Sequence, residues 1–214
     1  MTVRLILIGP PGVGKGTQAA LIEERLGARQ LSSGVIFRAE IEAETDLGQL
    51  AQSYIDRGVL VPDGVTIQMM LKRLRSEESR RRGFILDGFP RTVRQAEALD
   101  VELAKEEIDL DAVVSLEAPD ELILSRLAGR TGCTKCGAIY HSVNKPPKRE
   151  GFCDNCNSPL LLRSDDTGEG KVTQRLNTFR EMTSPVLGHY EAKGMLLRVD
   201  AAREAEAVYQ DILV

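Results

Sequence analysis

The sequence of 214 residues contains no tryptophan, and aromatic residues make up only 4% of it. A hydrophobic core must therefore be built mainly from aliphatic side chains. No apolar run approaches the roughly 20 residues that a membrane-spanning helix needs, which argues against an integral membrane protein of that type. The first apolar run begins within the first few residues, so we expect no signal peptide. We expect a cytoplasmic protein that does not contact membranes.

An excess of positive charge is also missing, since the formal net charge is −4. General binding to nucleic acid is therefore not expected, and any cationic chemistry must be local. Only two histidines occur, His141 and His189, and neither has a sequence partner that would indicate chemistry. The length suits one large domain or a core with inserted subdomains, and we expect a monomer.

The segment from Gly9 to Thr17 reads G-P-P-G-V-G-K-G-T and is the most informative in the chain. It follows the apolar run Leu5–Ile8 and precedes residues with helical periodicity, which gives the order strand, glycine-rich turn, helix. In such a turn the backbone N–H groups converge on an anion, and Lys15 reaches the outer phosphates. An ordinary glycine-rich turn would not require this lysine. The segment predicts binding of a nucleoside polyphosphate, although Gly16 stands where the usual pattern has a hydroxyl.

Short apolar runs typical of buried strands alternate along the chain with segments of helical periodicity. This alternation is typical of a parallel sheet that helices cover on both faces. We therefore predict an α/β fold class: a P-loop nucleotide-binding core with a central parallel β-sheet flanked by helices, plus two inserted flaps. The predicted strands are Leu5–Ile8, Phe84–Leu86, Val113–Leu116 and Leu196–Val199. The predicted helices are Gly14–Leu26, Val65–Leu74, Thr92–Leu103, Pro119–Leu127, Val172–Ala192 and Ala202–Leu213.

Two segments interrupt the alternation. Residues 32–61 predict short helices that end near Gly58 and Pro62. Residues 129–166 are rich in Gly, Pro, Cys and Asn and have little apolar periodicity. We expect both segments to be flaps on one core, which consists of residues 1–31, 62–128 and 167–214.

Two further runs indicate no chemistry. Arg80–Arg82 predicts a solvated loop before the second strand, and Met69–Leu71 predicts packing into the core. We find neither an internal repeat nor a low-complexity tract.

All four cysteines fall in the second flap with the spacing C-x2-C-x16-C-x2-C, as Cys133, Cys136, Cys153 and Cys156. This spacing is typical of a tetrahedral thiolate zinc site, and four ligands leave no open catalytic position. Disulfides or free thiols are the alternative, but a cytoplasmic chain seldom keeps disulfides. An iron–sulfur cluster and a zinc-ribbon nucleic-acid module also remain open, the latter disfavoured by the few stacking aromatics. We predict structural zinc that stabilises a flap with almost no core.

Asp87 ends the predicted strand in the run F-I-L-D-G-F-P-R. The carboxyl end of a strand in an open parallel sheet faces the ligand crevice. There a carboxylate can hold Mg2+ or its water shell against phosphates. An aspartate that only caps the turn before Gly88 is the alternative, which Lys15 in the same predicted crevice makes weaker.

Arg126 and Arg130 are four residues apart near the end of a helix that begins at Pro119, so they share a face. Such arginines can simply complement the helix dipole. This pair, however, leads into the cysteine flap, which ends near Arg163, and Arg175 follows on the next helix. Guanidinium groups match phosphate oxygens, so we predict that the flap closes over a multiply charged substrate. Because like charges repel, we expect the flaps to stay open until both nucleotide sites are filled.

Together these motifs resemble those of the bacterial-type, long-lid adenylate kinases, and the resemblance covers essentially the whole chain. In that family a parallel-sheet core carries an AMP-binding flap and a lid, and the reaction is ATP + AMP ⇌ 2 ADP with Mg2+. The resemblance implies that residues 32–61 bind AMP and that residues 129–166 form a zinc-binding lid. The motifs that carry it are Gly9–Gln18, Leu86–Thr92, Pro119–Leu122, the four cysteines with Ile139–His141, Pro146–Lys148, and Arg163–Asp166.

The resemblance also implies roles for individual residues at two nucleotide sites. The implied ATP contacts are Gly12, Val13, Gly14, Lys15, Gly16, Thr17, Arg126, Arg130, Ile139, Tyr140 and Arg203. The implied AMP contacts are Ser33, Gly34, Arg38, Val59, Leu60, Val61, Gly88, Phe89, Pro90, Arg91, Gln95, Arg163 and Arg175. The implied catalytic residues are Lys15, Asp87, Arg91, Arg126, Arg130, Arg163 and Arg175.

Some positions depart from the family pattern. The usual Ser-Thr-Gly-Asp of the AMP flap reads Ser-Ser-Gly-Val here, with Ser33 and Val35 as the changes. A related kinase with a different donor or acceptor base is therefore an alternative, although Gln95 favours adenine because a carboxamide can pair with an adenine edge. A nucleotide-binding regulatory module without turnover is another alternative, which the retained lysine, aspartate and arginines disfavour.

Overall fold

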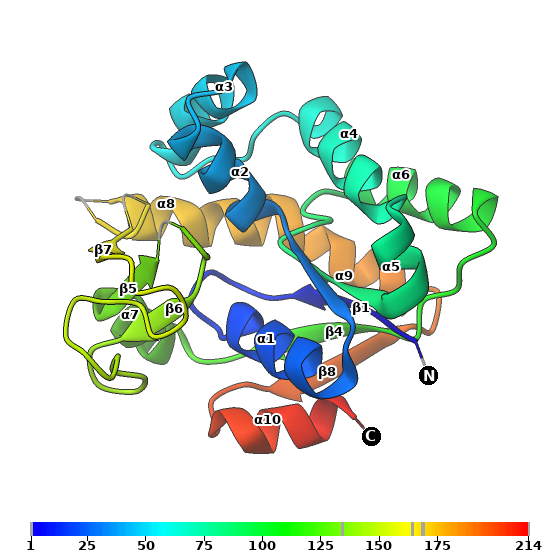
Figure 1. Cartoon of the computed structure of the whole chain (residues 1–214). Helices are drawn as coiled ribbons and strands as arrows, with labels where there is room; N and C mark the ends of the chain where they lie inside the picture. Colours follow the sequence, from blue (N-terminus) through cyan, green and yellow to red (C-terminus); the bar gives the residue numbers. More distant parts are fainter. Residues whose placement is uncertain (1, 134, 164, 168–169, 214) are drawn as a thin grey trace.

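The computed structural model describes residues 2–133, 135–163, 165–167 and 170–213. Its centre is a five-stranded parallel sheet in the order β2-β3-β1-β4-β8 (Figure 1). The four predicted strands are confirmed, and the fifth, β2, was missed because its sequence R-Q-L-S has no apolar run. The strands are β1 (Val3–Ile8), β2 (Arg29–Ser32), β3 (Gly83–Asp87), β4 (Ala112–Glu117) and β8 (Leu196–Asp200).

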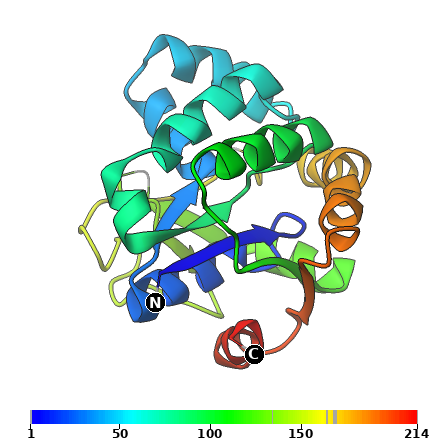
Figure 2. The ribbon, with the colours of Figure 1, turned by 90° about the vertical axis from the view of Figure 1, so that its right-hand side faces the viewer.

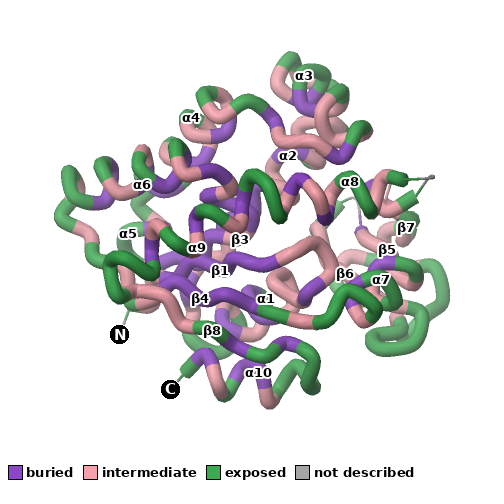
Figure 3. Tube along the Cα trace, turned by 180° about the vertical axis from the view of Figure 1, so that it is seen from behind, coloured by how far each residue is buried: buried purple, intermediate pink, exposed green. Residues whose placement is uncertain are grey.

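Both faces of the sheet are covered by helices, as the alternating sequence pattern predicts. Leu5 and Leu7 of β1 face α1 (Lys15–Leu26) and α10 (Ala205–Ile212), whereas Ile6 and Ile8 face the helices of the other side. In Figure 2 the C-terminal helix, in red, lies on one side of the sheet, and helices in green and orange lie on the other. Figure 3 shows the buried residues along the central strands. The fold class is therefore the predicted α/β core.

The second side of the sheet carries α4 (Asp63–Leu74), α6 (Val93–Lys105) and α9 (Ser184–Glu191). Met70 of α4 is fully buried there, and its neighbours pack beside it, in agreement with the sequence. The long helix predicted over 172–192 is instead α8 (Lys171–Thr178), a π-helical turn (Phe179–Thr183) and α9. Pro185 stands at the start of α9 and lacks an N–H, so the ordinary helical hydrogen bond to the preceding turn cannot form.

The prediction of a loop at Arg80–Arg82 is wrong, because these residues end the short helix α5 (Glu77–Arg82). The Ser76 side chain caps its N-terminus by accepting from Ser79 N. Acidic residues fill the first turn and the arginines fill the last, which complements the helix dipole. Arg82 also pairs with Glu78 at 3.0 Å. The N-terminal cap and the favourable placement of charges along the helix dipole thus stabilise α5, although its sequence has no apolar periodicity.

The first insert consists of α2 (Ser33–Glu42) and α3 (Asp46–Ile55), the short helices that the sequence predicts. The two helices approach closely at Gly48. A Cβ there would stand 2.1 Å from the Glu40 carbonyl oxygen, so only glycine permits this contact. The pair projects from the sheet at the top of Figure 1.

The second insert contains a small antiparallel sheet in the order β6-β5-β7. Its strands are β5 (Arg130–Cys133), β6 (Ile139–His141) and β7 (Leu160–Leu162). The helix α7 (Asp120–Ala128) leads into it, and α8 leads back to the core. The prediction that Arg126 and Arg130 share a helix face is wrong, because α7 ends at Ala128 and Arg130 begins β5. Among the described residues, no helix is both long enough and apolar enough to cross a bilayer.

Candidate active site

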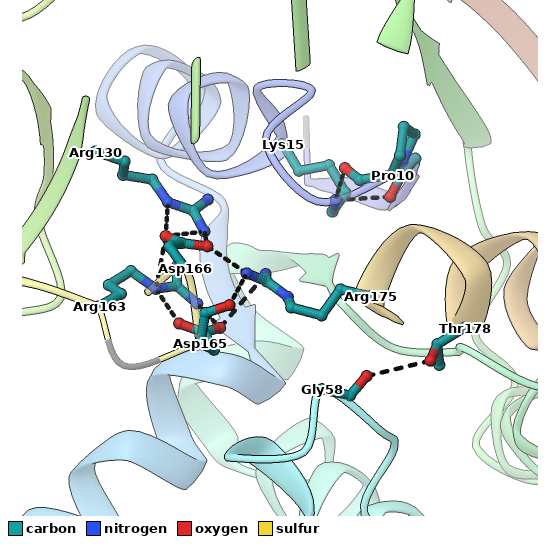
Figure 4. A network of polar contacts seen from close by, with 10 residues as sticks. Pro10, Lys15, Gly58, Arg130, Arg163, Asp165, Asp166, Arg175 and Thr178 are labelled. Carbon is teal, nitrogen blue, oxygen red and sulfur yellow. Dashed lines mark hydrogen bonds and ion pairs between the residues drawn. The ribbon is translucent and has the colours of Figure 1, made fainter. Parts of the chain in front are cut away.

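The glycine-rich turn joins β1 to α1 at the carboxyl edge of the central sheet. Lys15 Nζ donates to the carbonyl oxygens of Gly9 at 2.7 Å and Pro10 at 2.9 Å (Figure 4). Gly12 has a φ of 84°, and a Cβ there would lie 2.7 Å from Leu127 Cγ, so the turn requires glycine. The cap residue of α1 is Gly14, which offers no side chain that could accept from the helix N-terminus. Thr17 N donates to Gly14 O at 3.0 Å, whereas the N–H groups of Lys15 and Gly16 are available to an anion.

The charge of Lys15 is finely balanced. Burial lowers the pKa of Lys15 to about 7, and the neighbouring Asp87 carboxylate opposes this shift. Asp87 ends β3 beside the turn, where a Cβ on Gly16 would be 3.9 Å from its Oδ2. Gln30 of β2 donates to the same Asp87 oxygen at 3.3 Å. An anion next to Lys15 would restore its full positive charge.

Three arginines from separate segments meet at two carboxylates (Figure 4). Arg130 holds Asp166 with two hydrogen bonds of 2.6 Å, and Arg163 holds Asp165 at 2.6 and 2.9 Å. Arg175 pairs with both, at 3.4 Å from Asp165 and in close contact with Asp166. Although burial alone would raise the pKa of Asp165, Arg163 and Arg175 hold it well below its usual range. The two acids thus oppose the repulsion that the sequence analysis expected between these arginines, although burial and the charge of Arg163 still lower the pKa of Arg130 to about 10.

Arg38 and Arg91 differ from those three, since neither forms an ion pair with any residue that the structure describes. Burial, and then the charge of Arg163, lowers the pKa of Arg38 to about 9. Burial likewise lowers the pKa of Arg91, whose Nε donates to the Gly88 carbonyl at 2.8 Å. Two half-buried guanidinium groups without a carboxylate are costly unless an anion joins them.

Gly88 is the point at which the first insert meets the core. Its carbonyl accepts from Ser33 Oγ at 2.6 Å as well as from Arg91. Its φ is 74°, and a Cβ would stand 2.6 Å from Arg91 Nη2 and 2.8 Å from Ser33 Oγ. The Ser33 hydroxyl therefore keeps a contact with the core.

Gln95 lies in the first turn of α6, fully buried. Its Oε1 accepts from Arg91 N at 2.8 Å, and its Nε2 donates to Asp63 Oδ1 at 2.7 Å. Sequence reasoning missed Asp63. As an acid in the first turn of α4, directly after Pro62, it looks like an ordinary complement to the helix dipole.

Gly58, the residue directly before the Val59–Val61 segment, lies against α8 at the base of the first insert, whereas Val61 packs into the apolar cluster of that insert. Thr178 Oγ1 donates to the Gly58 carbonyl at 3.1 Å (Figure 4). A Cβ on Gly58 would lie 3.1 Å from Arg175 Cγ, so this turn also lies beside the arginine cluster. Thr178 is a second residue that sequence reasoning missed, because it belongs to no motif.

Of three residues of the implied ATP site, one contacts the glycine-rich turn and the other two have partners elsewhere. Arg126 lies against the glycine-rich turn, with Nη1 donating to Val13 O at 3.1 Å and Ala201 O at 2.9 Å. Arg203 instead pairs with Asp211 on α10. The hydroxyl of Tyr140 is turned toward the cysteines and accepts from Asp154 N at 2.7 Å.

The four cysteine sulfurs of the second insert lie within 4.8 Å of one another. Two Sγ–Sγ distances are 3.4 Å, far longer than a disulfide and close to the roughly 3.8 Å of four sulfurs around zinc. Gly137 and Asn157 have φ of 73° and 56°, as expected where each knuckle turns back. Hydrogen bonds from Ser158 lower the pKa of Cys156 to about 6, which favours the thiolate that metals bind. The donor set therefore fits a tetrahedral zinc ion.

The two inserts contact each other. A Cβ on Gly137 would stand 3.1 Å from Cγ1 of Val35 on α2. The cysteine insert thus contacts the first helix of the other insert. Val35 supplies the apolar side of this contact.

The histidines do have partners, contrary to the sequence analysis. His189 Nε2 lies 2.6 Å from Asp100 Oδ2, which joins α9 to α6. His141 Nδ1 accepts from the backbone N–H groups of Val143 and Asn144 at 3.1 Å. Both contacts organise local structure outside the crevice.

Comparisons with known proteins agree with this geometry. The family model described as adenylate kinase matches residues 7–195. The adenylate kinase of Desulforamulus reducens is 48% identical over 212 residues, covering 99% of both chains. That of Clostridium tetani is 47% identical over 210 residues, covering 98% of this chain and 96% of the relative. That of Streptomyces avermitilis is 46% identical over 209 residues, with 97% and 94% covered. The chain belongs to the adenylate kinase family.

Proposed function

We propose that this protein catalyses the reversible transfer of a phosphoryl group in ATP + AMP ⇌ 2 ADP. The observation that carries the proposal is the pair Arg38 and Arg91, neither of which forms an ion pair with a described carboxylate. Burial and the charge of Arg163 lower the pKa of both arginines, and the charge of Asp87 raises it. A second anion site opposite the glycine-rich turn is what a nucleotide acceptor needs. One anion site alone would suit a protein that only hydrolyses or senses a nucleotide.

The donor nucleotide is assigned to the glycine-rich turn. Its phosphates would lie on the N–H groups at the start of α1, where Lys15 exchanges its two carbonyl partners for phosphate oxygens. Arg126 holds the turn and the Ala201 loop together from the other side. The donor residues are Gly12, Val13, Gly14, Lys15, Gly16, Thr17, Arg126, Arg130, Ile139, Tyr140 and Arg203.

The acceptor nucleotide is assigned to the side of the first insert. Arg38 and Arg91 would hold its phosphate, and Gln95 would contact its base. The carbonyls and turns at Gly58 and Gly88 bring this insert against the core. The acceptor residues are Ser33, Gly34, Arg38, Val59, Leu60, Val61, Gly88, Phe89, Pro90, Arg91 and Gln95.

Phosphoryl transfer in such a site depends on positioning and on charge stabilisation. Arg130, Arg163 and Arg175 would turn from Asp165 and Asp166 toward the oxygens of the transferred group, where each guanidinium gains an anion as charge redistributes. Mg2+ held with ATP would neutralise phosphate charge, and the place of Asp87 beside Gly16 suits it to hold that ion's water shell. Contact between the two inserts excludes water and so prevents hydrolysis of ATP.

Zinc is assigned a structural role in the second insert. Four cysteine ligands complete a tetrahedron, so the ion would offer no position to substrate. We propose the same division of the chain as the sequence indicated: core residues 1–31, 62–128 and 167–214, an AMP-binding flap over 32–61, and a zinc lid over 129–166.

A coupled assay over a panel of nucleotides tests the function. We expect turnover with ATP and AMP in the presence of Mg2+, and much weaker turnover when GTP replaces ATP or when CMP or UMP replaces AMP. A preference for another acceptor would assign a related kinase activity. Nucleotide binding without any turnover would overturn the proposal in favour of a regulatory module.

A further inference from the structure

We propose that Asp63 is a specificity-determining residue that fixes the orientation of the Gln95 carboxamide, so that the acceptor site selects adenine over 6-oxopurines. This inference rests on the proposed acceptor site, and it assigns a role to a residue that touches neither phosphate nor base. The proposed role is to decide how the oxygen and the nitrogen of the Gln95 carboxamide are oriented toward the nucleotide.

The carboxamide of Gln95 is held by two partners of opposite character. Arg91 N is a donor, 2.8 Å from Oε1, and Asp63 Oδ1 is an acceptor, 2.7 Å from Nε2. The other oxygen of Asp63 accepts from Thr92 Oγ1 at 3.0 Å. That hydroxyl oxygen in turn accepts from Gln95 N at 3.2 Å. The beginnings of α4 and α6 are thus tied together around one amide.

Rotating the amide by half a turn would break both contacts at once. The amide oxygen would then face the carboxylate of Asp63, and the amide nitrogen would face the N–H of Arg91. Both pairs are repulsive, acceptor against acceptor and donor against donor. Gln95 is only 1% exposed, so water cannot replace the lost partners. The protein therefore holds a single orientation.

The held orientation leaves one hydrogen on Nε2 and one lone pair on Oε1 without a partner among the described residues. An adenine edge presents an acceptor at N1 beside a donor at N6, and it complements that pair. A 6-oxopurine presents a donor at N1 beside an acceptor at O6, so it requires the rotated amide. Asp63 and the Arg91 N–H make that rotation costly, and a site with unpaired buried groups rejects the mismatched base strongly.

The decisive comparison uses AMP and inosine monophosphate, which differ only at N1 and at position 6. In the wild-type protein, kcat/KM should strongly favour AMP. Asp63→Asn keeps the shape but presents an amide that can face either end of Gln95, so the AMP-to-IMP ratio should fall by about tenfold or more. KM for AMP should rise and KM for ATP should stay unchanged. Asp46→Asn is the matched control, because Asp46 also stands in the first turn of a helix but lies exposed.

A double-substitution cycle separates this role from a structural one. In a Gln95→Ala background, Asp63→Asn should leave the AMP-to-IMP ratio unchanged, since no amide remains to be oriented. Thr92→Val, which frees one oxygen of Asp63, should lower the ratio less than Asp63→Asn does. Two results would overturn the inference, provided that the wild-type protein phosphorylates AMP. In the first, Asp63→Asn and Thr92→Val both keep the wild-type AMP-to-IMP ratio of kcat/KM. In the second, Asp63→Asn lowers that ratio equally in the presence and in the absence of the Gln95 side chain. Absence of AMP turnover in the wild type would instead refute the proposed function.

Discussion

At the scale of the residue, Lys15 links the state of the crevice to pH. Burial lowers its pKa to about 7, whereas a polyphosphate beside it would favour the charged form and raise that pKa. Binding of ATP at pH 8 should therefore take up a proton, and affinity should weaken as pH rises above 7. Calorimetry in two buffers of different ionisation enthalpy measures this uptake. The Lys15→Met variant should bind ATP without proton uptake. Equal binding heats in both buffers for the wild-type protein would contradict the assignment of this uptake to Lys15.

Arg91 allows a second test at the same scale. Arg91→Ala should reduce kcat by about 10³-fold or more, because an arginine that contacts the transferred phosphate can contribute on the order of 10³–10⁵ in rate. Arg94→Ala, a nearby exposed arginine on α6, is the control and should keep its activity. Steady-state kinetics with folded protein decide the matter. Retention of more than about a tenth of the wild-type rate, a loss of only ~1.4 kcal/mol, would remove Arg91 from the transfer step.

At the scale of the element, the second insert, which we propose to be a zinc lid, is an unusually small unit. Its buried cluster consists of Cys133, Tyr140 and Cys153 with a few partly buried neighbours, and Leu161 and Leu162 of β7 are exposed. So little apolar burial cannot hold three short strands together. We therefore infer that the proposed lid depends on a bound metal ion, and its stability should be separable from that of the core.

We therefore expect one zinc per chain in metal analysis of the purified protein. Cys153→Ser should increase hydrogen exchange in residues 129–166 while β1, β3 and β4 stay protected, because structural zinc contributes about 10–16 kcal/mol in small domains. Asn144→Ala, an exposed change in the same lid, should leave exchange unaltered. Iron in place of zinc, or equal loss of protection in lid and core, would contradict this prediction.

At the scale of the whole molecule, closure brings together charges from segments far apart in the sequence. Asp165 and Asp166 lie between Arg130, Arg163 and Arg175, so the closed arrangement does not depend on phosphate alone to offset repulsion. The contact of Val35 with Gly137 adds an apolar stop between the inserts. The free energy of closure should therefore have an electrostatic contribution from the ion pairs and an apolar contribution from Val35, and substitutions should change each of them separately.

Dyes placed near Asn144 on the lid and Glu42 on the flap should approach when a two-adenosine, five-phosphate analogue binds, because only the closed state offers all the ligand contacts. Val35→Asp should weaken this response, since it brings an unpaired carboxylate against the lid. Val35→Leu, which stays apolar, is the control. An inter-dye distance that is the same with and without the analogue would show that the inserts do not move.

The sequence by itself determined the features that depend on neighbouring residues. The glycine-rich turn, Lys15, the four strands with apolar runs and the cysteine knuckles all follow from local spacing, because turn geometry and side-chain period act over a few residues. Only the tertiary structure decided the rest. The strand β2 has no pattern and forms by pairing with β3, and the contact of Asp63 with Gln95 spans 32 positions. The packing of distant segments decides which arginines form ion pairs with a carboxylate, such as Arg130 and Arg163, and which do not, such as Arg38. No local sequence pattern encodes these pairings.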